Sequence, residues 1–191
     1  MYFSNKIVLA SHSPRRSQLL EQAEVQFIIR ARLTDESFPA DLPLEEVPVY
    51  IAKSKALAVQ PECRKDELII AADTLVMLDN EIIGKPADER DAIEMLKKLS
   101  GNRHRVITGV CLLKGETMKS FSETTEVYFR TLSEPQILHY LSKYKPYDKA
   151  GAYAIQEWIG LIGIEKIKGD YFNVMGLPVG RVVREIAHWP S

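Results

Sequence analysis

The chain has 191 residues, a net charge of −1 at pH 7 and two cysteines. This length can bury a full hydrophobic core, and because no Pro-, Gly- or Ser-rich linker divides it, we expect one domain. The near-neutral charge excludes a broad electrostatic surface for a nucleic-acid polymer, so any nucleic-acid-like ligand should be small. Cys63 and Cys111 are too few for a disulfide framework and lack metal-ligand spacing, which favours a reducing cytoplasm. We expect no membrane association, since the sequence contains neither a long apolar run nor a signal-peptide pattern.

The amino-terminal stretch 7–16 predicts an anion-binding turn. It reads as a short apolar strand that ends at Ser11, followed by a helix capped by Ser13. Helix amino termini carry unpaired N–H groups and a positive partial charge, and Arg15 and Arg16 add two cations there. Arginine is unfavourable at this end of the helix dipole by about 0.3–1 kcal/mol, so the pair indicates an anion between them. An ordinary strand–turn–helix connection with solvated arginines fits the same residues equally well.

The next segment predicts a strand over 25–29 and a helix from about residue 44 to 59. Glu36 falls in the polar loop between them, where an acid is also expected simply as a solvated side chain. Pro48 belongs in the first turn of a helix, which moves the expected start later than residue 44. Lys55 lies at the border of the apolar face, where a snorkelling lysine and a functional lysine are equally consistent.

A continuous apolar run over 68–72 predicts a strand buried on both faces. The run ends at Asp73, and an acid that interrupts such a run needs a reason. Residues 79–80 predict a hairpin turn into a short strand. The tripeptide Gly84-Lys85-Pro86 follows, in which glycine allows a close backbone approach, although this phosphate signal is weak by itself.

The second half of the chain predicts a helix, a hairpin, a helix, a strand and a last helix. We expect helices over 89–99 and from 133 onward, strands over 106–113, 117–130 and 159–167, and a helix over 178–188. His104 has no second histidine at ligand spacing, so we expect a hydrogen-bonding structural residue. The segment 144–156 mixes aromatic, charged and small residues, which suits a wall around a flat ligand. The edge of strand 117–130 could pair with a second copy in a homodimer, and the oligomeric state stays open.

Short blocks along the whole chain match one ordered set of motifs. They are Leu9–Arg16, Asp35–Glu36, Lys55–Ala56, Ala72–Thr74, Gly84–Pro86, Ser100–Val110, Asp148–Gly151 and Gly176–Pro178. One block alone would be a weak signal. The collinear set resembles the Maf (septum-formation-inhibitor-like) family of nucleoside triphosphate pyrophosphatases.

The resemblance implies a fold and an activity. The fold would be α/β, a mixed twisted sheet flanked by helices, similar to that of the inosine triphosphate pyrophosphatases, with residues 1–191 forming one domain and a central cleft between two lobes. The activity would be cleavage of a nucleoside triphosphate to the monophosphate and pyrophosphate, with Mg²⁺ or Mn²⁺. The alternative is a nucleotide-binding regulator of cell division without catalysis. Asp73 and Glu36 weigh against it, because phosphate binding alone has no use for acids beside the anion.

The resemblance also implies roles for particular residues. Asp73 falls on the proposed proton acceptor, and with Glu36 it would reach the metal or its water. A carboxylate of ordinary acidity is a poor base at neutral pH, so the metal must carry part of the activation. Whether Asp73 is base or ligand stays open. The positions that bind phosphate or supply further cations are Ser11, Arg16, Lys55 and Lys85.

Three further positions distinguish branches of the family and here hold Arg15, Thr74 and Gln156. This combination is similar to the branch that acts on dTTP and UTP. The branch that prefers 7-methyl-GTP has tryptophan, glutamine and glutamate there. Gln156 can offer both a donor and an acceptor to a uracil or thymine edge, which a glutamate cannot.

Overall fold

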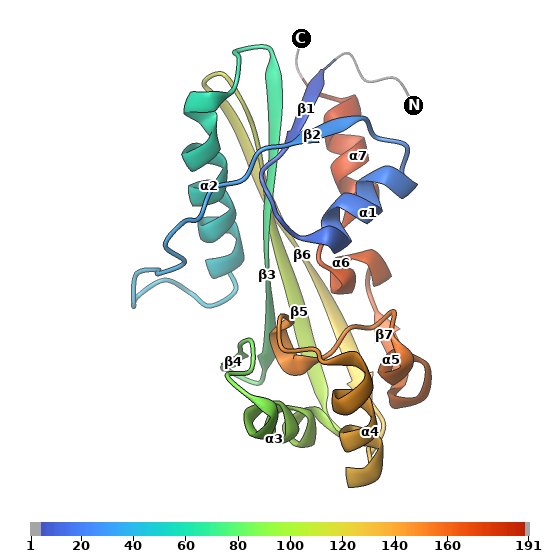
Figure 1. Ribbon diagram of the computed structural model, residues 1–191. Helices are drawn as coiled ribbons and strands as arrows, with labels where there is room; N and C mark the ends of the chain where they lie inside the picture. Colours follow the sequence, from blue (N-terminus) through green and yellow to red (C-terminus); the bar gives the residue numbers. More distant parts are fainter. Residues whose placement is uncertain (1–4, 190–191) are drawn as a thin grey trace. The chain divides into compact units, whose positions relative to one another are not determined.

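The computed structural model describes residues 5–189, which form a mixed seven-stranded sheet with helices packed on it (Figure 1). The strand order is β2-β1-β3-β5-β6-β7, with β4 paired to β3. β1 is parallel to β2 and β3, whereas β4 and β7 are antiparallel to their neighbours. The strands are β1 (Lys6–Leu9), β2 (Phe27–Ile29), β3 (Glu67–Leu78), β4 (Glu81–Ile83), β5 (Arg103–Lys114), β6 (Thr117–Phe129) and β7 (Ile164–Lys168). The predicted mixed α/β fold is confirmed.

The helices follow the predicted order, except that one helix was not predicted and another replaces the first half of a predicted strand. They are α1 (Pro14–Gln22), α2 (Val47–Val59), α3 (Glu89–Leu99), α4 (Glu134–Tyr144), α5 (Trp158–Gly163), α6 (Tyr171–Met175) and α7 (Val179–Ala187), with 3-10 turns at Gln60–Glu62 and Ala150–Ala152. Among the described residues, no helix is long and apolar enough to span a membrane. The start of the sequence, where no signal-peptide pattern is found, lies largely outside the described residues.

The chain divides into two compact units. Unit 1 comprises residues 1–74, 108–123 and 176–191, and unit 2 comprises residues 75–107 and 124–175. The three long strands β3, β5 and β6 contribute residues to both units. The single cleft-bearing domain expected from the family stays a prediction.

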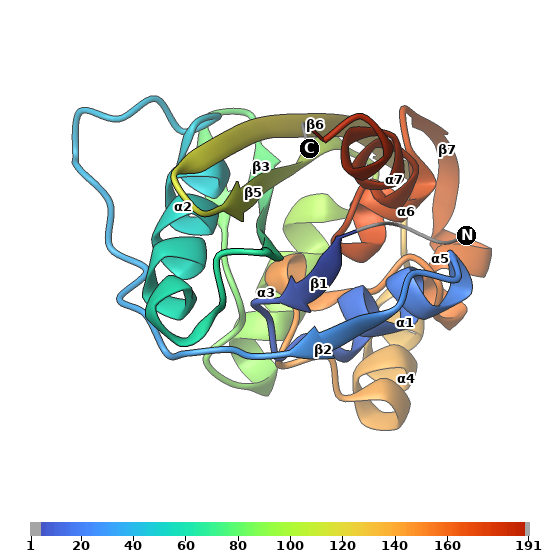
Figure 2. The same cartoon turned by 90° about the horizontal axis from the view of Figure 1, so that it is seen from above.

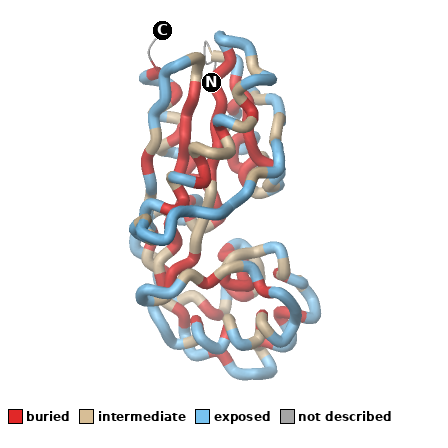
Figure 3. The backbone as a smooth tube through the Cα atoms, turned by 90° about the vertical axis from the view of Figure 1, so that its left-hand side faces the viewer, coloured by how far each residue is buried: buried red, intermediate tan, exposed pale blue. Residues whose placement is uncertain are grey.

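In unit 1, the sheet is buried on both faces. Val8 of β1 and Ile69 of β3 pack with Ala52 and Ala56 of α2 in one apolar cluster. Alternate residues of a strand point to opposite faces of the sheet. Leu68, the residue before Ile69 in β3, therefore faces away from α2, toward the side of the sheet where α7 lies (Figure 1 and Figure 2). The strand backbone is mainly buried, and the connecting loops are exposed (Figure 3). This confirms the burial expected of residues 68–72.

Two predicted strands need correction. Strand β3 does not end at Asp73 but continues to Leu78, because the acid has a partner within the fold, described below. The strand expected over 159–167 is wrong in its first half, where α5 precedes β7. A short apolar run cannot distinguish helix from strand, and here Gly160 lets the helix backbone pack against Ile155. Helix α6 was not predicted.

Two details of the other elements bear on the sequence predictions. Helix α2 begins at Val47 with Pro48 in its first turn, which confirms the expected later start. The edge of β6 is less open than expected, since β7 pairs with residues 126–129 in unit 2. In unit 1, Arg181 of α7 donates a hydrogen bond to the Ser122 carbonyl at 2.9 Å.

Candidate functional site

The turn from β1 into α1 has the expected form with a different hydrogen bond. Ser13 is the extended N-cap residue and Pro14 opens the helix, as predicted. The hydroxyl of Ser13 caps none of the described N–H groups. Instead, Ser11 Oγ accepts the backbone N–H of Ser13 at 3.2 Å. Ser11 is therefore the residue that organises this helix entry.

Arg16 occupies a cradle built from distant parts of unit 1. Its Nε donates to the Gly176 carbonyl at 2.8 Å, Nη1 to Ser11 Oγ at 3.2 Å and Nη2 to Thr74 Oγ1 at 3.1 Å. Thr74 Oγ1 in turn lies 2.9 Å from Thr108 Oγ1. A guanidinium has five N–H donors, so these contacts leave others for a ligand. The cradle fixes the direction in which the cation faces.

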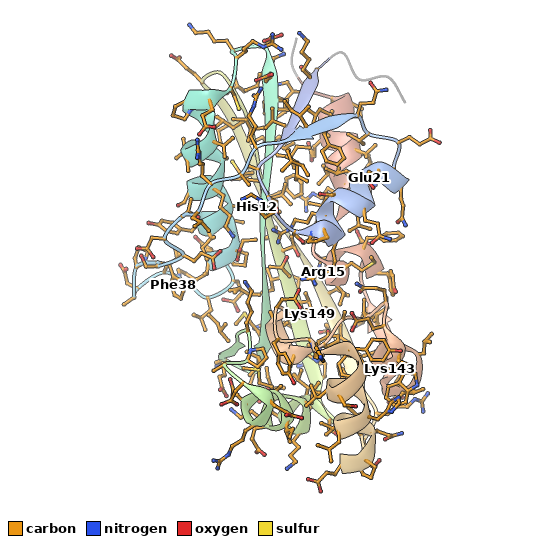
Figure 4. All side chains as sticks on the ribbon, viewed as in Figure 1. His12, Arg15, Glu21, Phe38, Lys143 and Lys149 are labelled. Atoms are coloured by element: carbon orange, nitrogen blue, oxygen red, sulfur yellow. The ribbon has the colours of Figure 1, made fainter. Side chains whose placement is uncertain are left out.

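Burial shapes the electrostatics of this arginine. Arg16 is 9% exposed, and burial lowers its pKa from the usual value, an effect that Asp73 opposes. Arginine titrates so high that it stays protonated in proteins, and a partly desolvated guanidinium attracts an anion more strongly than a solvated one. The neighbouring Arg15 lies on the first turn of α1, as Figure 4 labels, and its charge lowers the pKa of Arg16 further.

A second cluster of charges surrounds Lys55. Its Nζ lies 2.7 Å from Asp73 Oδ1 and 2.7 Å from Glu36 Oε1. The side chains of Lys55 and Asp73 are 17% and 13% exposed, whereas Glu36 is half exposed. Two carboxylates from different segments, β3 and the loop before α2, thus converge on one cation. The ammonium of Lys55 is thus paired with both candidate acids, and its functional role stays a prediction.

The two acids of the polar loop have separate roles in the structure. Asp35 accepts hydrogen bonds from the Ser37 hydroxyl at 2.8 Å and from the Ser37 N–H at 2.9 Å. These bonds lower the pKa of Asp35 and close a local turn. Glu36, the next residue, is the one that reaches Lys55. The exposed tip of the same loop carries Phe38 (Figure 4).

Sequence reasoning gave no role to three residues that build this site. Thr108 and Gly176 complete the Arg16 cradle through a hydroxyl and a carbonyl. At Gly109, an added Cβ would lie 2.2 Å from backbone atoms of Pro48 and Val49, so this glycine lets α2, which carries Lys55, approach β5 closely. All three lie in blocks that carried the family resemblance, and that was the available signal.

Lys85 and Gln156 belong to unit 2. Lys85 is exposed and follows Gly84, whose carbonyl accepts the N–H of Gly151 at 2.9 Å. Gln156 is exposed in the turn before α5. The structure therefore ties the Gly84-Lys85 segment to the segment that leads to Gln156, within one unit.

His104 is the structural histidine that the sequence predicts. Its Nε2 lies 2.7 Å from the Tyr153 hydroxyl, and its ring packs on Phe129 with 5.5 Å between ring centroids. Burial lowers the pKa of His104 to about 3. A neutral imidazole is expected throughout the physiological range.

A family model and relatives of known name both match nearly the whole chain. The family model described as Maf-like protein matches residues 6–189. The dTTP/UTP pyrophosphatase of Phocaeicola vulgatus is 52% identical over 182 residues, covering 95% of this chain and 94% of that protein. The dTTP/UTP pyrophosphatase of Cytophaga hutchinsonii is 50% identical over 180 residues, covering 94% and 82%.

A solved structure of the Staphylococcus aureus Ham1 protein aligns with 75% of this chain and 100% of that chain. The identity is 16% and the TM-score 0.43. At this level of likeness, the fold assignment rests on the sheet and helices of this chain itself.

Proposed function

We propose that this chain, which belongs to the family of Maf-like proteins, hydrolyses dTTP and UTP to the monophosphate and pyrophosphate. The observation that carries the proposal is the convergence of Asp73 and Glu36 on Lys55 in the unit that also holds the Arg16 cradle. Cations bind and neutralise phosphate, and acids handle a proton or a metal ion. A site for hydrolysis needs both kinds of group.

The phosphate groups of the substrate bind, in this proposal, to the amino terminus of α1 and to Arg16. The N–H donors of Arg16 that do not contact Gly176, Ser11 or Thr74 would bind the anion, and Ser11 organises the turn that leads into the helix. Lys55 and Lys85 supply further positive charge. Positive charge of this kind stabilises the charge that develops on the phosphoryl oxygens and on the pyrophosphate leaving group.

The residues present fit a divalent ion that arrives with the nucleotide. Among residues 5–189, no group of three or more His, Cys, Asp or Glu side chains could hold a metal. Mg²⁺ commonly uses only one or two carboxylates, together with water and substrate phosphates, and Asp73 and Glu36 already share one cation, the Lys55 ammonium. Mg²⁺ or Mn²⁺ bound there would neutralise phosphate charge and make the attacking water more acidic.

The chemical step is attack of a water oxygen on the α-phosphorus, with cleavage of the bond to the oxygen that bridges the α and β phosphates. Asp73 accepts the proton of the water, and Lys55 holds the Asp73 carboxylate in place. The pair of electrons in the broken bond leaves with pyrophosphate. Glu36 assists from the loop.

Substrate choice is assigned to Gln156, Arg15 and Thr74. Gln156 presents a donor and an acceptor to the pyrimidine edge. The hydroxyl of Thr74 accepts a hydrogen bond from Arg16 and lies beside the hydroxyl of Thr108. These contacts support an effect of Thr74 on substrate choice through Arg16, without direct contact between Thr74 and the base. We propose a cytoplasmic location, which the free thiols of Cys63 and Cys111 support.

The test is pyrophosphate release from a panel of nucleoside triphosphates with Mg²⁺ or Mn²⁺. We expect release from dTTP and UTP, and a loss of at least about a hundredfold in turnover for Asp73→Asn, with nucleotide binding retained. Asp66→Asn, an exposed acid next to β3, is the matched control and should be unaffected. Binding without release would favour the regulatory alternative, and full turnover by Asp73→Asn would remove this residue from the mechanism.

A further inference from the structure

Tyr140 is a buried tyrosine of α4 whose hydroxyl makes hydrogen bonds to both ends of a single turn in unit 2. The residue is 0% exposed. Its oxygen accepts the backbone N–H of Ala154 at 3.1 Å and donates its proton to the carboxylate of Glu157. Burial and the Glu157 carboxylate raise the pKa of Tyr140, so the hydroxyl keeps its proton. One side chain therefore contacts residues 154 and 157 together.

These two contacts lie at the ends of the turn that carries Gln156. The N–H of Glu157 donates to the Ala154 carbonyl at 3.1 Å, which closes a four-residue turn with Ile155 and Gln156 at its centre. Gln156 is exposed, whereas Ala154 and Ile155 are buried. The turn thus presents one amide side chain to the outside from an immobilised backbone.

Other contacts hold the same turn from the other side. The N–H of Gly160 in α5 donates to the Glu157 carbonyl at 2.9 Å, and an added Cβ at Gly160 would lie 1.7 Å from the Ile155 carbonyl oxygen. Lys149, which is labelled in Figure 4 and follows α4 in the sequence, places Nζ 3.7 Å from Glu157 Oε1. The carboxylate of Glu157 is therefore held between a phenol and an ammonium.

We propose that Tyr140 is a positioning residue that fixes the Gln156 turn and thereby determines the choice of uracil or thymine over cytosine. This inference rests on the proposed pyrophosphatase function. An amide rotated by 180° exchanges its donor and its acceptor, so a mobile glutamine matches the donor–acceptor pattern of cytosine as well as that of uracil. The hydroxyl of Tyr140 holds both ends of the turn, so the backbone that carries Gln156 is fixed and limits the directions from which the amide reaches the base.

The experiment compares Tyr140→Phe with a control on the same helix. Ser142 of α4 is exposed, and its hydroxyl donates to the His139 carbonyl at 3.0 Å, so Ser142→Ala, which also removes one hydroxyl from this helix, should behave as the unchanged protein. The measurements are kcat and KM for UTP, dTTP and CTP. We expect Tyr140→Phe to raise KM for UTP and dTTP about tenfold and to lower the preference for UTP over CTP, with kcat much less affected.

A double-variant cycle distinguishes positioning from general support of the fold. If Tyr140 acts through Gln156, then Tyr140→Phe should change the UTP to CTP preference no further in a Gln156→Ala background. Glu157→Ala removes the other partner of the phenol and should relax the same preference, which keeps the test valid if Tyr140→Phe folds poorly. Thermal unfolding of each variant reports on the fold.

The outcomes separate this inference from the proposed function. Unchanged KM and preference in Tyr140→Phe, or effects that simply add to those of Gln156→Ala, would overturn the positioning role and leave the pyrophosphatase function standing. Failure of the unchanged protein to release pyrophosphate from dTTP and UTP would overturn the function and the inference with it.

Discussion

Lys55 Nζ and Asp73 Oδ1 lie 2.7 Å apart, which joins a residue of α2 to a residue inside β3. The contact explains how an acid can stand within a buried strand, because a paired carboxylate costs far less to bury than an isolated one. It also places a cation beside the acid that we assign as proton acceptor. Gly109 makes the contact possible by letting α2 approach the sheet.

We expect Lys55→Met to lower kcat/KM for dTTP and UTP by about a hundredfold or more. The methionine keeps the aliphatic stem but leaves Asp73 and Glu36 facing each other without the ammonium between them. The measurement is steady-state pyrophosphate release. Lys65→Met, an exposed lysine before β3, is the control, and an equal effect on both variants would contradict a special role for Lys55.

Replacement of Thr74 by valine tests the cradle of Arg16. The two side chains have the same shape, so the change removes the hydrogen bonds to Arg16 and Thr108 with little loss of packing. We expect a loss of about 1–3 kcal/mol in the free energy of unfolding. We also expect a higher KM for nucleotide, because the guanidinium of Arg16 loses a hydrogen bond that fixes its orientation. Denaturant unfolding and kinetics measure the two effects. Thr117→Val at the exposed start of β6 should change neither, and unaltered KM in Thr74→Val would argue against the cradle.

The order of elements and the candidate acids were predictable because local signals carry them. Apolar runs and capping residues mark α1, α3 and α4, and the acid at position 73 stood out against its apolar neighbours. The contacts of Arg16 were not predictable, since its partners at 74 and 176 come from parts of the chain far from α1, and only folding brings them together. Helix α5 escaped detection because its apolar residues lack helical spacing and depend on Gly160 for their packing.

Glu67 provides a test of stability against pH, away from the proposed site. This carboxylate is 2% exposed and lies 2.6 Å from Arg30 Nη1, and the hydrogen bond to Arg30 lowers the pKa of Glu67 to about 2. A pKa lower in the folded state than in the unfolded state means that stability is present above the ordinary pKa near 4.5 and is lost as pH falls toward 2. We therefore expect Glu67→Gln to be less stable than the unchanged protein at pH 7 and to lose less stability on acidification.

The measurement is the free energy of unfolding in denaturant between about pH 7 and pH 2. Glu81→Gln, an exposed acid of β4, should follow the unchanged protein throughout. Parallel curves for Glu67→Gln and the unchanged protein would show that this ion pair contributes nothing to the acid sensitivity.

Gln156→Glu tests how the base is chosen. A carboxylate offers acceptors only, so it faces a pyrimidine carbonyl without the donor that the amide supplies. A mismatched buried polar contact costs more than lost packing, and we expect kcat/KM for UTP and dTTP to fall by about a hundredfold, while the rate of pyrophosphate release at saturation changes less. Gln18→Glu on the exposed face of α1 introduces the same charge and should leave the nucleotide profile intact. The same profile in Gln156→Glu as in the unchanged protein would exclude Gln156 from base recognition, and the Tyr140 contact would then serve only to hold the turn.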